Sequence, residues 1–174
     1  VVRNLCRAGY RVRVAVRKPH LAGDQRLAGD VGQVQIVQAN VRNRPSIQRA
    51  LEGASGVINL VGILFERGQQ TFEGTQGLGA KNVAELAAEA GITNFVQLSA
   101  IGADAESEAE YARTKAAAEA DVRQYMPSAA IVRPSIIFGP EDDFFNRFAA
   151  MAQISPVLPL IGGGETKFQP AYVG

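Results

Sequence analysis

Residues 94–115 read NFVQLSAIGADAESEAEYARTK, a stretch that joins a short run of β-branched and aromatic residues to a polar loop and then to a helical pattern. The run 94–99 predicts a strand, and 108–124 predicts a helix. The same alternation continues through the chain. It predicts further strands at 11–16, 34–38, 56–61 and 129–133, and further helices near 45–52 and 74–90. Strands that alternate with helices in this way are typical of an α/β fold with a parallel sheet.

The two ends of the chain shape the expected domain. No linker, repeat or low-complexity tract divides the 174 residues, so a single domain spanning 1–174 is predicted. The opening VVRNLCRAGY has helical spacing but no preceding strand or cap, which suggests a start inside a helix. The expected fold is a Rossmann-type, doubly wound parallel sheet that is truncated at the N-terminus, with its first strand and glycine-rich loop upstream of Val1. The stretch 170–174 brings no closing element, so both ends are expected to be incomplete.

Composition narrows the possible functions. An apolar content of 47% suits a buried core, and no apolar run approaches the ~20 residues of a transmembrane helix, so no transmembrane segment is expected. Cys6 is the only cysteine and His20 the only histidine, so neither a disulfide nor a metal site is predicted. Residues 1–50 carry ten Lys/Arg against two Asp/Glu, whereas the remainder carries eight against fifteen. A basic first third suits a phosphate-bearing ligand or solvated helix faces. No nucleic-acid module accompanies it, so no nucleic-acid partner is expected.

Three residues suggest acid–base chemistry. Tyr111 and Lys115 are four residues apart, which places both side chains on one helix face. An ammonium beside a phenol is expected to lower the pKa of Tyr111 toward a value useful for proton transfer. Ser99 falls at the carboxyl end of a predicted strand, the edge where parallel sheets bind ligands, and its hydroxyl could bond a substrate oxygen. Each feature has an ordinary alternative: a chance Tyr/Lys pair, or a serine that caps a turn.

These residues carry a family resemblance. Together with YARTKAAAE (111–119), IVRPSIIFGPEDDFFNRFA (131–149) and GGGETKFQPAYV (162–173), they resemble the atypical or extended short-chain dehydrogenases/reductases. Within that superfamily the chain resembles the branch related to subunit nine of the mitochondrial complex I alpha subcomplex, whose bacterial relatives are epimerase/dehydratase-like. The resemblance implies a bound NADP(H), partners among respiratory complex I subunits, and a role more structural than catalytic. It also implies a bacterial cytoplasmic location, peripheral at the inner membrane, or the matrix side of mitochondria.

The resemblance also assigns residues to the adenosine end of the dinucleotide. Arg17 and Lys18 follow the first predicted strand, where an acidic residue would bond the ribose of NAD(H). Two cations there suit the 2′-phosphate of NADP(H) instead. Asn40 and Val41 follow the next strand, at the position that relatives place against the adenine.

Further positions are assigned to the middle and the nicotinamide end. Leu60, Val61 and Gly62 match the segment that runs under the phosphates and ribose, with Gly62 allowing close backbone approach. Leu60 and Val61 could equally be plain core residues. Pro134 and Ser135 match the stretch beside the nicotinamide, although a strand-ending turn would read the same way. Lys115 is also implied to hold the cofactor ribose.

Three functions remain open from the sequence. The leading hypothesis is an NADP(H)-binding protein of the complex I accessory type. The first alternative is an active oxidoreductase or epimerase/dehydratase that uses Ser99, Tyr111 and Lys115. The second is a nucleotide-free interaction domain. The stretch 103–110, ADAESEAE, is short and acidic, so the sugar-nucleotide recognition of related enzymes is not expected to transfer.

Overall fold

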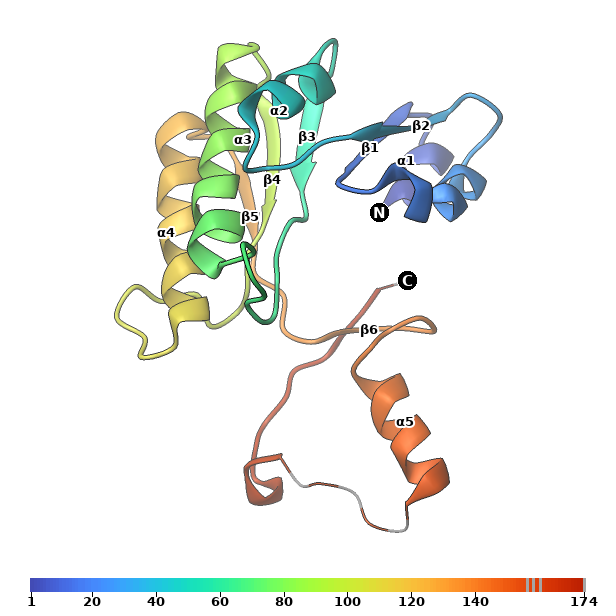
Figure 1. The fold of residues 1–174 in the computed structure, drawn as a ribbon, viewed down its shortest axis with the longest axis vertical. Coiled ribbons are helices and arrows are strands. Elements are labelled where there is room, and N and C mark those ends of the chain that lie inside the picture. Colours follow the sequence, from blue (N-terminus) through green and yellow to red (C-terminus); the bar gives the residue numbers. More distant parts are fainter. Residues whose placement is uncertain (156, 158, 160, 174) are drawn as a thin grey trace.

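The alternation of strands and helices predicted above is confirmed. The computed structural model describes residues 1–155, 157, 159 and 161–173; Gly174, the last residue of the expected domain, lies outside this part. The elements in chain order are α1 (Val2–Arg7), β1 (Val12–Val16), β2 (Val34–Gln38), α2 (Arg44–Leu51), β3 (Gly56–Asn59), α3 (Leu78–Glu89), β4 (Asn94–Leu98), α4 (Glu110–Tyr125), β5 (Ala130–Val132), β6 (Ile137–Phe138), α5 (Phe145–Ile154) and β7 (Ala171–Tyr172) (Figure 1). A π-helical turn, η3 (Glu73–Gly77), leads into α3.

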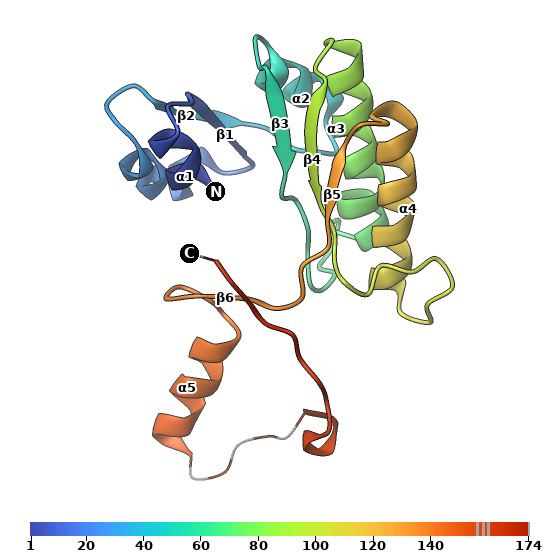
Figure 2. The ribbon, with the colours of Figure 1, turned by 180° about the vertical axis from the view of Figure 1, so that it is seen from behind.

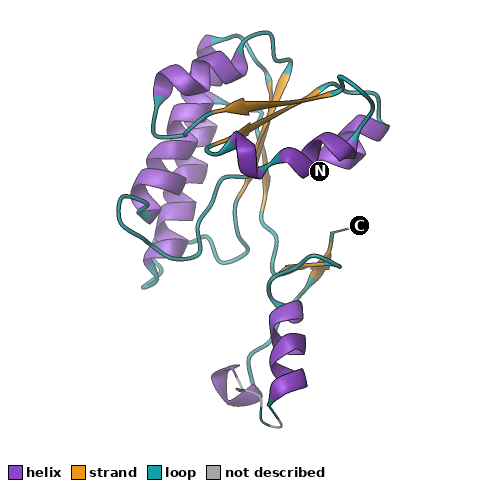
Figure 3. Cartoon of the chain, turned by 45° about the vertical axis from the view of Figure 1, so that its right-hand side comes forward, coloured by secondary structure: helices purple, strands orange, loops and turns teal. Residues whose placement is uncertain are grey.

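All strand pairs between these elements are parallel, as the sequence predicts. β1 pairs with β2, β4 lies between β3 and β5, and β6 pairs with β7. The register places Val14 opposite Ile36 and Ile58 opposite Val96. The pairing therefore falls into three separate parts, with the β1–β2 pair crossing in front of β3, β4 and β5 (Figure 3).

Strand ends differ from the expected ranges for a local reason. β3 ends at Asn59 rather than at residue 61, because the Asn59 side-chain oxygen accepts a hydrogen bond from the Val61 backbone N–H at 3.2 Å and turns the chain. β4 ends at Leu98, one residue before Ser99. The residues expected to carry function thus lie in the loops just beyond the carboxyl ends of the strands.

The core lies between the helices and the three-stranded sheet. Helices α3 and α4 lie side by side over one face of β3, β4 and β5 (Figure 2). Ala84 and Ala87 on α3 are fully buried, and their small side chains let the neighbouring helix approach closely. Val122 on α4 and Phe95 on β4 fill the space between the layers. α3 ends before Gly91, whose φ of +70° is a backbone conformation that glycine adopts without strain.

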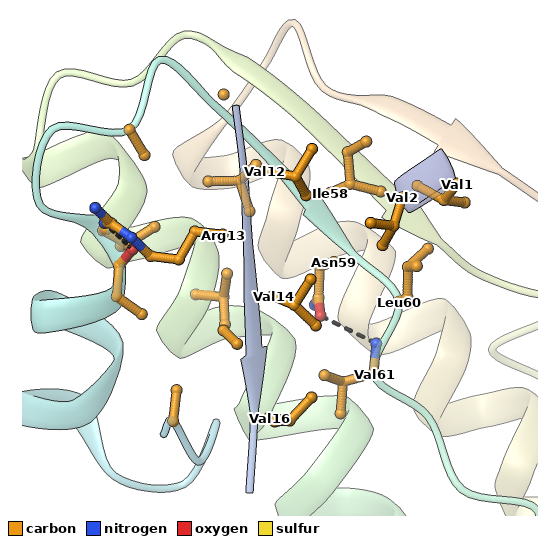
Figure 4. Close-up of a pocket in the computed structure, with 18 of the residues that line it drawn as sticks. Val1, Val2, Val12, Arg13, Val14, Val16, Ile58, Asn59, Leu60 and Val61 are labelled. Carbon is orange, nitrogen blue, oxygen red and sulfur yellow. Dashed lines mark hydrogen bonds between the residues drawn. The ribbon is translucent and has the colours of Figure 1, made fainter. Parts of the chain in front are cut away.

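The β1–β2 pair lies apart from this core. β1 and β3 share no hydrogen bond, and a groove of about 2010 Å³ separates them. Val12, Val14 and Val16 from β1 line one side of the groove, and Ile58 and Leu60 line the other (Figure 4). Among the described residues, none of the helices has both the length and the hydrophobicity that a bilayer crossing requires.

Candidate functional site

Tyr111 and Lys115 come together on the first turns of α4. The Lys115 Nζ lies over the Tyr111 ring, 5.9 Å from its centroid, so the spacing of four brings them together as expected. The ring of Phe72 meets the Tyr111 ring edge-on, with the two centroids 5.8 Å apart. These contacts fix the phenol ring between a cation and an aromatic neighbour.

The expected pKa of Tyr111 was wrong in direction. Burial raises the pKa of the Tyr111 phenol above its ordinary value, because tyrosinate would lose its hydration. Burial also lowers the pKa of Lys115, and the Glu119 carboxylate one turn later partly opposes this. The phenol therefore keeps its proton at neutral pH, which suits a group that donates a proton to a substrate oxygen.

Gly62 joins the groove to this pair. A Cβ atom at Gly62 would lie 3.2 Å from the Lys115 Nζ, so the glycine leaves room for the ammonium. The ammonium also donates a hydrogen bond to the Leu98 carbonyl oxygen at 3.4 Å. Gly62 itself lines the groove between β1 and β3. The sequence predicted that a cofactor approaches the backbone closely at Gly62. In the structure the Lys115 Nζ lies against this glycine.

A buried carboxylate that the sequence analysis did not identify lies one turn beyond Lys115. Glu119 is 5% exposed, and the Arg133 Nε and Nη2 atoms donate to its two oxygens at 2.8 and 2.5 Å. Burial pushes the pKa of Glu119 up, but the hydrogen bonds from Arg133, together with the nearby Ser99 hydroxyl, outweigh it and hold the pKa below its usual value. Its spacing of four from Lys115 was the signal that could have identified it.

Ser99 is buried rather than open at the sheet edge. Its side chain is 5% exposed and lies close enough to Glu119 to help lower the pKa of that carboxylate. Within the described part of the chain, its hydroxyl makes no well-aligned hydrogen bond. The substrate-bonding role expected of Ser99 stays a prediction.

Gln76, on the turn η3, is a second residue that the sequence did not single out. Its Nε2 donates to the Thr114 Oγ1 at 2.9 Å, and Thr114 directly precedes Lys115. In the described chain the Gln76 Oε1 and the Thr75 Oγ1 are buried without a hydrogen-bond partner. No pattern in a single sequence marks a glutamine for this position. Unpaired buried polar atoms this close to Lys115 suit a polar ligand.

The residues predicted for the adenosine end and those predicted for the phosphates and ribose line the groove. Arg17, Lys18, Asn40, Val41, Leu60 and Val61 all border it, together with Gly62. The Arg17 Nη1 donates to the Gln70 Oε1 at 2.6 Å, which holds the guanidinium near the carboxyl end of β1. The Asn40 side-chain oxygen accepts from the Arg42 N–H at 3.1 Å, so it is used within a local turn.

Pro134 and Ser135 lie in the connection that follows β5. The Pro134 carbonyl oxygen accepts a hydrogen bond from the Ile101 N–H at 2.9 Å, which ties the loop after β4 to the end of β5. Neither residue borders the groove. Their expected place beside a nicotinamide stays a prediction.

The two ends of this arrangement suit the two ends of a dinucleotide. Two cationic side chains, Arg17 and Lys18, border the groove near the end of β1, and Gly62 allows a close backbone approach farther along. Beyond Gly62 lie the Lys115 ammonium and the unpaired Gln76 oxygen. These residues could hold the phosphates, ribose and amide of such a ligand.

Known sequences match most of the chain. Residues 1–143 match the family model described as NAD(P)H-binding. The chain is similar to the mitochondrial NADH dehydrogenase [ubiquinone] 1 alpha subcomplex subunit 9 of Arabidopsis thaliana, with 40% identity over 149 residues, covering 85% of this chain and 37% of that protein. It is also similar to the ceramide reductase of Caulobacter vibrioides, with 34% identity over 161 residues, covering 92% of this chain and 49% of that protein. The chain thus spans less than half the length of these relatives.

Solved structures share the fold at low identity. The UDP-glucuronic acid 4-epimerase of Bacillus cereus, in complex with UDP-glucuronic acid and NAD, matches with a TM-score of 0.76 and 17% identity, covering 98% of this chain and 65% of that one. A putative NAD-dependent epimerase/dehydratase of Bacillus halodurans matches with a TM-score of 0.69 and 21% identity, covering 82% and 66%. The predicted Rossmann-type fold is confirmed, and identities this low carry no more than the fold.

Proposed function

This chain belongs to the NAD(P)H-binding family, and we propose that it binds NADP(H) across the end of the groove formed by the carboxyl ends of β1 and β3, with the nicotinamide end directed toward Tyr111 and Lys115. The single observation that carries the proposal is the position of Gly62. It borders the groove and also lies against the Lys115 ammonium, so one extended ligand could touch both regions. Arg17 and Lys18 support NADP(H) over NAD(H), since a 2′-phosphate is doubly negative.

The side chains support proton transfer to a carbonyl oxygen. A bound nicotinamide would supply the hydride, or accept one in the reverse direction. Tyr111 holds its proton at neutral pH and donates it from its hydroxyl as the alcohol forms. Lys115 lies over the ring and stabilises the tyrosinate that remains. In the reverse reaction the tyrosinate takes the proton back from the alcohol.

Two roles for such a domain are supported by its relatives. The name of the Arabidopsis relative supports a role as a subunit of respiratory complex I. For that role we propose an accessory subunit in which the nucleotide serves structure more than turnover. The retained Tyr111 and Lys115, and the name of the Caulobacter relative, support an active oxidoreductase. We propose nucleotide binding as common to both, which separates them from the nucleotide-free interaction domain.

Substitution at Gly62 tests the shared proposal. Gly62→Ala should weaken NADPH binding by at least about tenfold in calorimetric titration, because the added methyl group narrows the junction. The fold should tolerate the change, since the crowded atom is the end of a flexible lysine. The matched control is Gly102→Ala, where an added Cβ meets nothing within 4 Å. Equal NADPH affinity in both variants would contradict the proposal that the nucleotide passes Gly62 in the groove.

A further inference from the structure

We propose that the Tyr111–Lys115 site takes an uncharged substrate with a long apolar chain that carries the reacting carbonyl or alcohol group, rather than a nucleotide sugar. This inference rests on the oxidoreductase form of the proposed function. It is carried by the apolar side chains exposed near the carboxyl ends of the strands and by the acidic residues beside them.

Exposed apolar side chains gather on two segments. They are between 41% and 84% exposed, well above what a packed core leaves open: Leu64, Phe65, Ile101, Ile137, Phe145 and Tyr172. The first three lie in the loops that follow β3 and β4, and the last three lie in the unit formed by β6, α5 and β7. Apolar side chains this exposed, on segments around one edge of the sheet, favour a binding site for an apolar ligand there.

The two segments flank the carboxyl ends of the central strands. β3, β4 and β5 point their carboxyl ends toward the unit that holds β6 and α5 (Figures 1 and 2). The hydrogen bond from Ile101 N–H to the Pro134 carbonyl ties the loop after β4 to the chain that leads into β6. Ligands of parallel α/β sheets bind at this edge, so a chain lying there would have its end near Tyr111.

Aromatic contacts give the second segment a fixed shape. The Phe138 ring packs against the Phe145 ring at 5.6 Å and against the Tyr172 ring at 5.5 Å between centroids. Phe144 meets Phe145 edge-on at 5.2 Å. The rings therefore hold one another in place, so the exposed faces of Phe145 and Tyr172 are available to a ligand at little conformational cost.

The charge of the surroundings selects against an anionic substrate. The loop that leads into Tyr111 carries Asp104, Glu106, Glu108 and Glu110, and the stretch before α5 carries Glu141, Asp142 and Asp143. Neither 103–110 nor 140–145 contains a lysine or arginine. The diphosphate of a nucleotide sugar would meet these carboxylates, whereas a neutral chain meets none of that repulsion. The cations needed for phosphate lie instead at the adenosine end of the groove.

The chemical step balances with the nicotinamide dinucleotide as reductant. For an aldehyde, the hydride from the reduced nicotinamide forms the new C–H bond at the carbonyl carbon. The Tyr111 proton goes to the carbonyl oxygen, and the products are a primary alcohol and the oxidised dinucleotide. The apolar chain takes no part in this step and serves to hold the carbonyl carbon in place.

The test uses dodecanal and UDP-glucuronic acid as probes on the full-length protein. With methyl-labelled leucine and isoleucine and saturating NADP⁺, dodecanal should shift the NMR signals of Leu64 and Ile101, while UDP-glucuronic acid should leave them unchanged. With NADPH, dodecanal should be consumed, and with NADP⁺, UDP-glucuronic acid should form no NADPH.

Variants on the exposed surface sharpen the result. Leu64→Ser combined with Ile101→Ser should weaken dodecanal binding by about tenfold, because both side chains lose their apolar contact. The control, Leu27→Ser, changes an equally exposed leucine on a segment distant from β3 and β4 and should bind as the unchanged protein does.

Failure of this inference and failure of the proposed function give different results. Dodecanal binding without NADPH consumption would support the apolar site and overturn the oxidoreductase role. NADPH formation from NADP⁺ with UDP-glucuronic acid, without NADPH consumption with dodecanal, would keep the oxidoreductase role and overturn the apolar substrate. The exposed apolar surface could instead bind a second copy of the chain. A dimer that the double variant abolishes, and that dodecanal does not affect, would also overturn the apolar substrate.

Discussion

The unit formed by α1, β1 and β2 and the body formed by β3, β4, β5, α3 and α4 differ in burial and in charge. The clustered core residues lie between Ile47 and Ala129, whereas Cys6 and Val34 are the buried apolar residues described in the first unit. Residues 1–50 are strongly basic, and the loop 103–110 at the carboxyl edge of the body is acidic. The residues proposed for nucleotide choice, Arg17 and Lys18, therefore belong to the first unit, and those proposed for proton transfer, Tyr111 and Lys115, belong to the body.

This division has a consequence for substitutions. Exposed cations on the first unit contact few buried groups, so replacing them should change affinity and leave the free energy of unfolding nearly constant. Residues of the body such as Glu119 support both the site and the core. Changes there should alter stability and function together.

The largest effect is expected at Tyr111. Tyr111→Phe should lower the rate of hydride transfer by about two to four orders of magnitude while the NADPH dissociation constant stays within a few-fold, since the hydroxyl serves proton transfer more than binding. Stopped-flow absorbance with dodecanal measures the first quantity and calorimetry the second. Tyr10→Phe, on the exposed first unit, is the control. An unchanged rate of hydride transfer in Tyr111→Phe would show that Tyr111 is not the proton donor.

The same variant separates the two proposed roles. If the domain serves complex I as an accessory subunit, cells that carry Tyr111→Phe should assemble complex I normally on native gels, while Gly62→Ala should impair assembly. If the domain serves as an oxidoreductase, assembly should not respond to either variant. Impaired assembly in Tyr111→Phe with unchanged NADPH binding fits neither role.

A smaller effect is expected at the buried carboxylate. Glu119→Gln should reduce the free energy of unfolding by about 1–2 kcal/mol, because the charge-assisted bonds from Arg133 weaken in a buried place. The comparison variant is Glu85→Gln, which loses a more exposed ion pair with Arg44 and should cost less. Urea unfolding of both variants measures the difference. A larger loss of unfolding free energy in Glu85→Gln than in Glu119→Gln would contradict this prediction.

The pH dependence of stability should follow the same pair and is the smallest effect. The folded-state pKa of Glu119 is held below its ordinary value, so its ionised form stabilises the fold above the unfolded-state pKa. That contribution is lost as the pH falls through the folded-state pKa. The stability gap between the unchanged protein and Glu119→Gln should therefore be full near neutral pH and shrink below about pH 4. A gap that is constant over this range would show that Glu119 does not act through its charge.

Periodicity was enough to predict β1 to β5, the helices α2, α3 and α4, and the parallel pairing. It did not predict β6, α5 or β7, and the expectation of no closing element at 170–174 was wrong, because Ala171 and Tyr172 pair with β6. Strands of two residues are too short to show a period. Spacing was enough to bring Tyr111 and Lys115 together, because residues four apart on a helix are neighbours whatever surrounds them. The pKa of Tyr111 was predicted in the wrong direction, since a sequence shows which charge is near but not how much water is excluded. Gln76 was missed for the same reason, as its burial arises from packing against α4.

The strand and glycine-rich turn expected upstream of Val1 stay a prediction. The groove between β1 and β3 is bordered by two strand edges that do not pair with each other, and Val12 and Ile58 face it. The roles of Ser99, Pro134 and Ser135 also stay predictions, because burial and loop position alone do not assign a ligand.

The most direct test of the account is a calorimetric titration of the full-length protein with NADPH and with NADH. The account predicts that NADPH binds about ten- to a hundredfold more tightly, and that Arg17→Ala removes most of this difference, because Arg17 lies at the carboxyl end of β1 where the 2′-phosphate is expected. Arg11→Ala, at the opposite end of the same strand, should keep the difference. Equal affinities for the two nucleotides, a preference for NADH, or an unchanged preference in Arg17→Ala would contradict it.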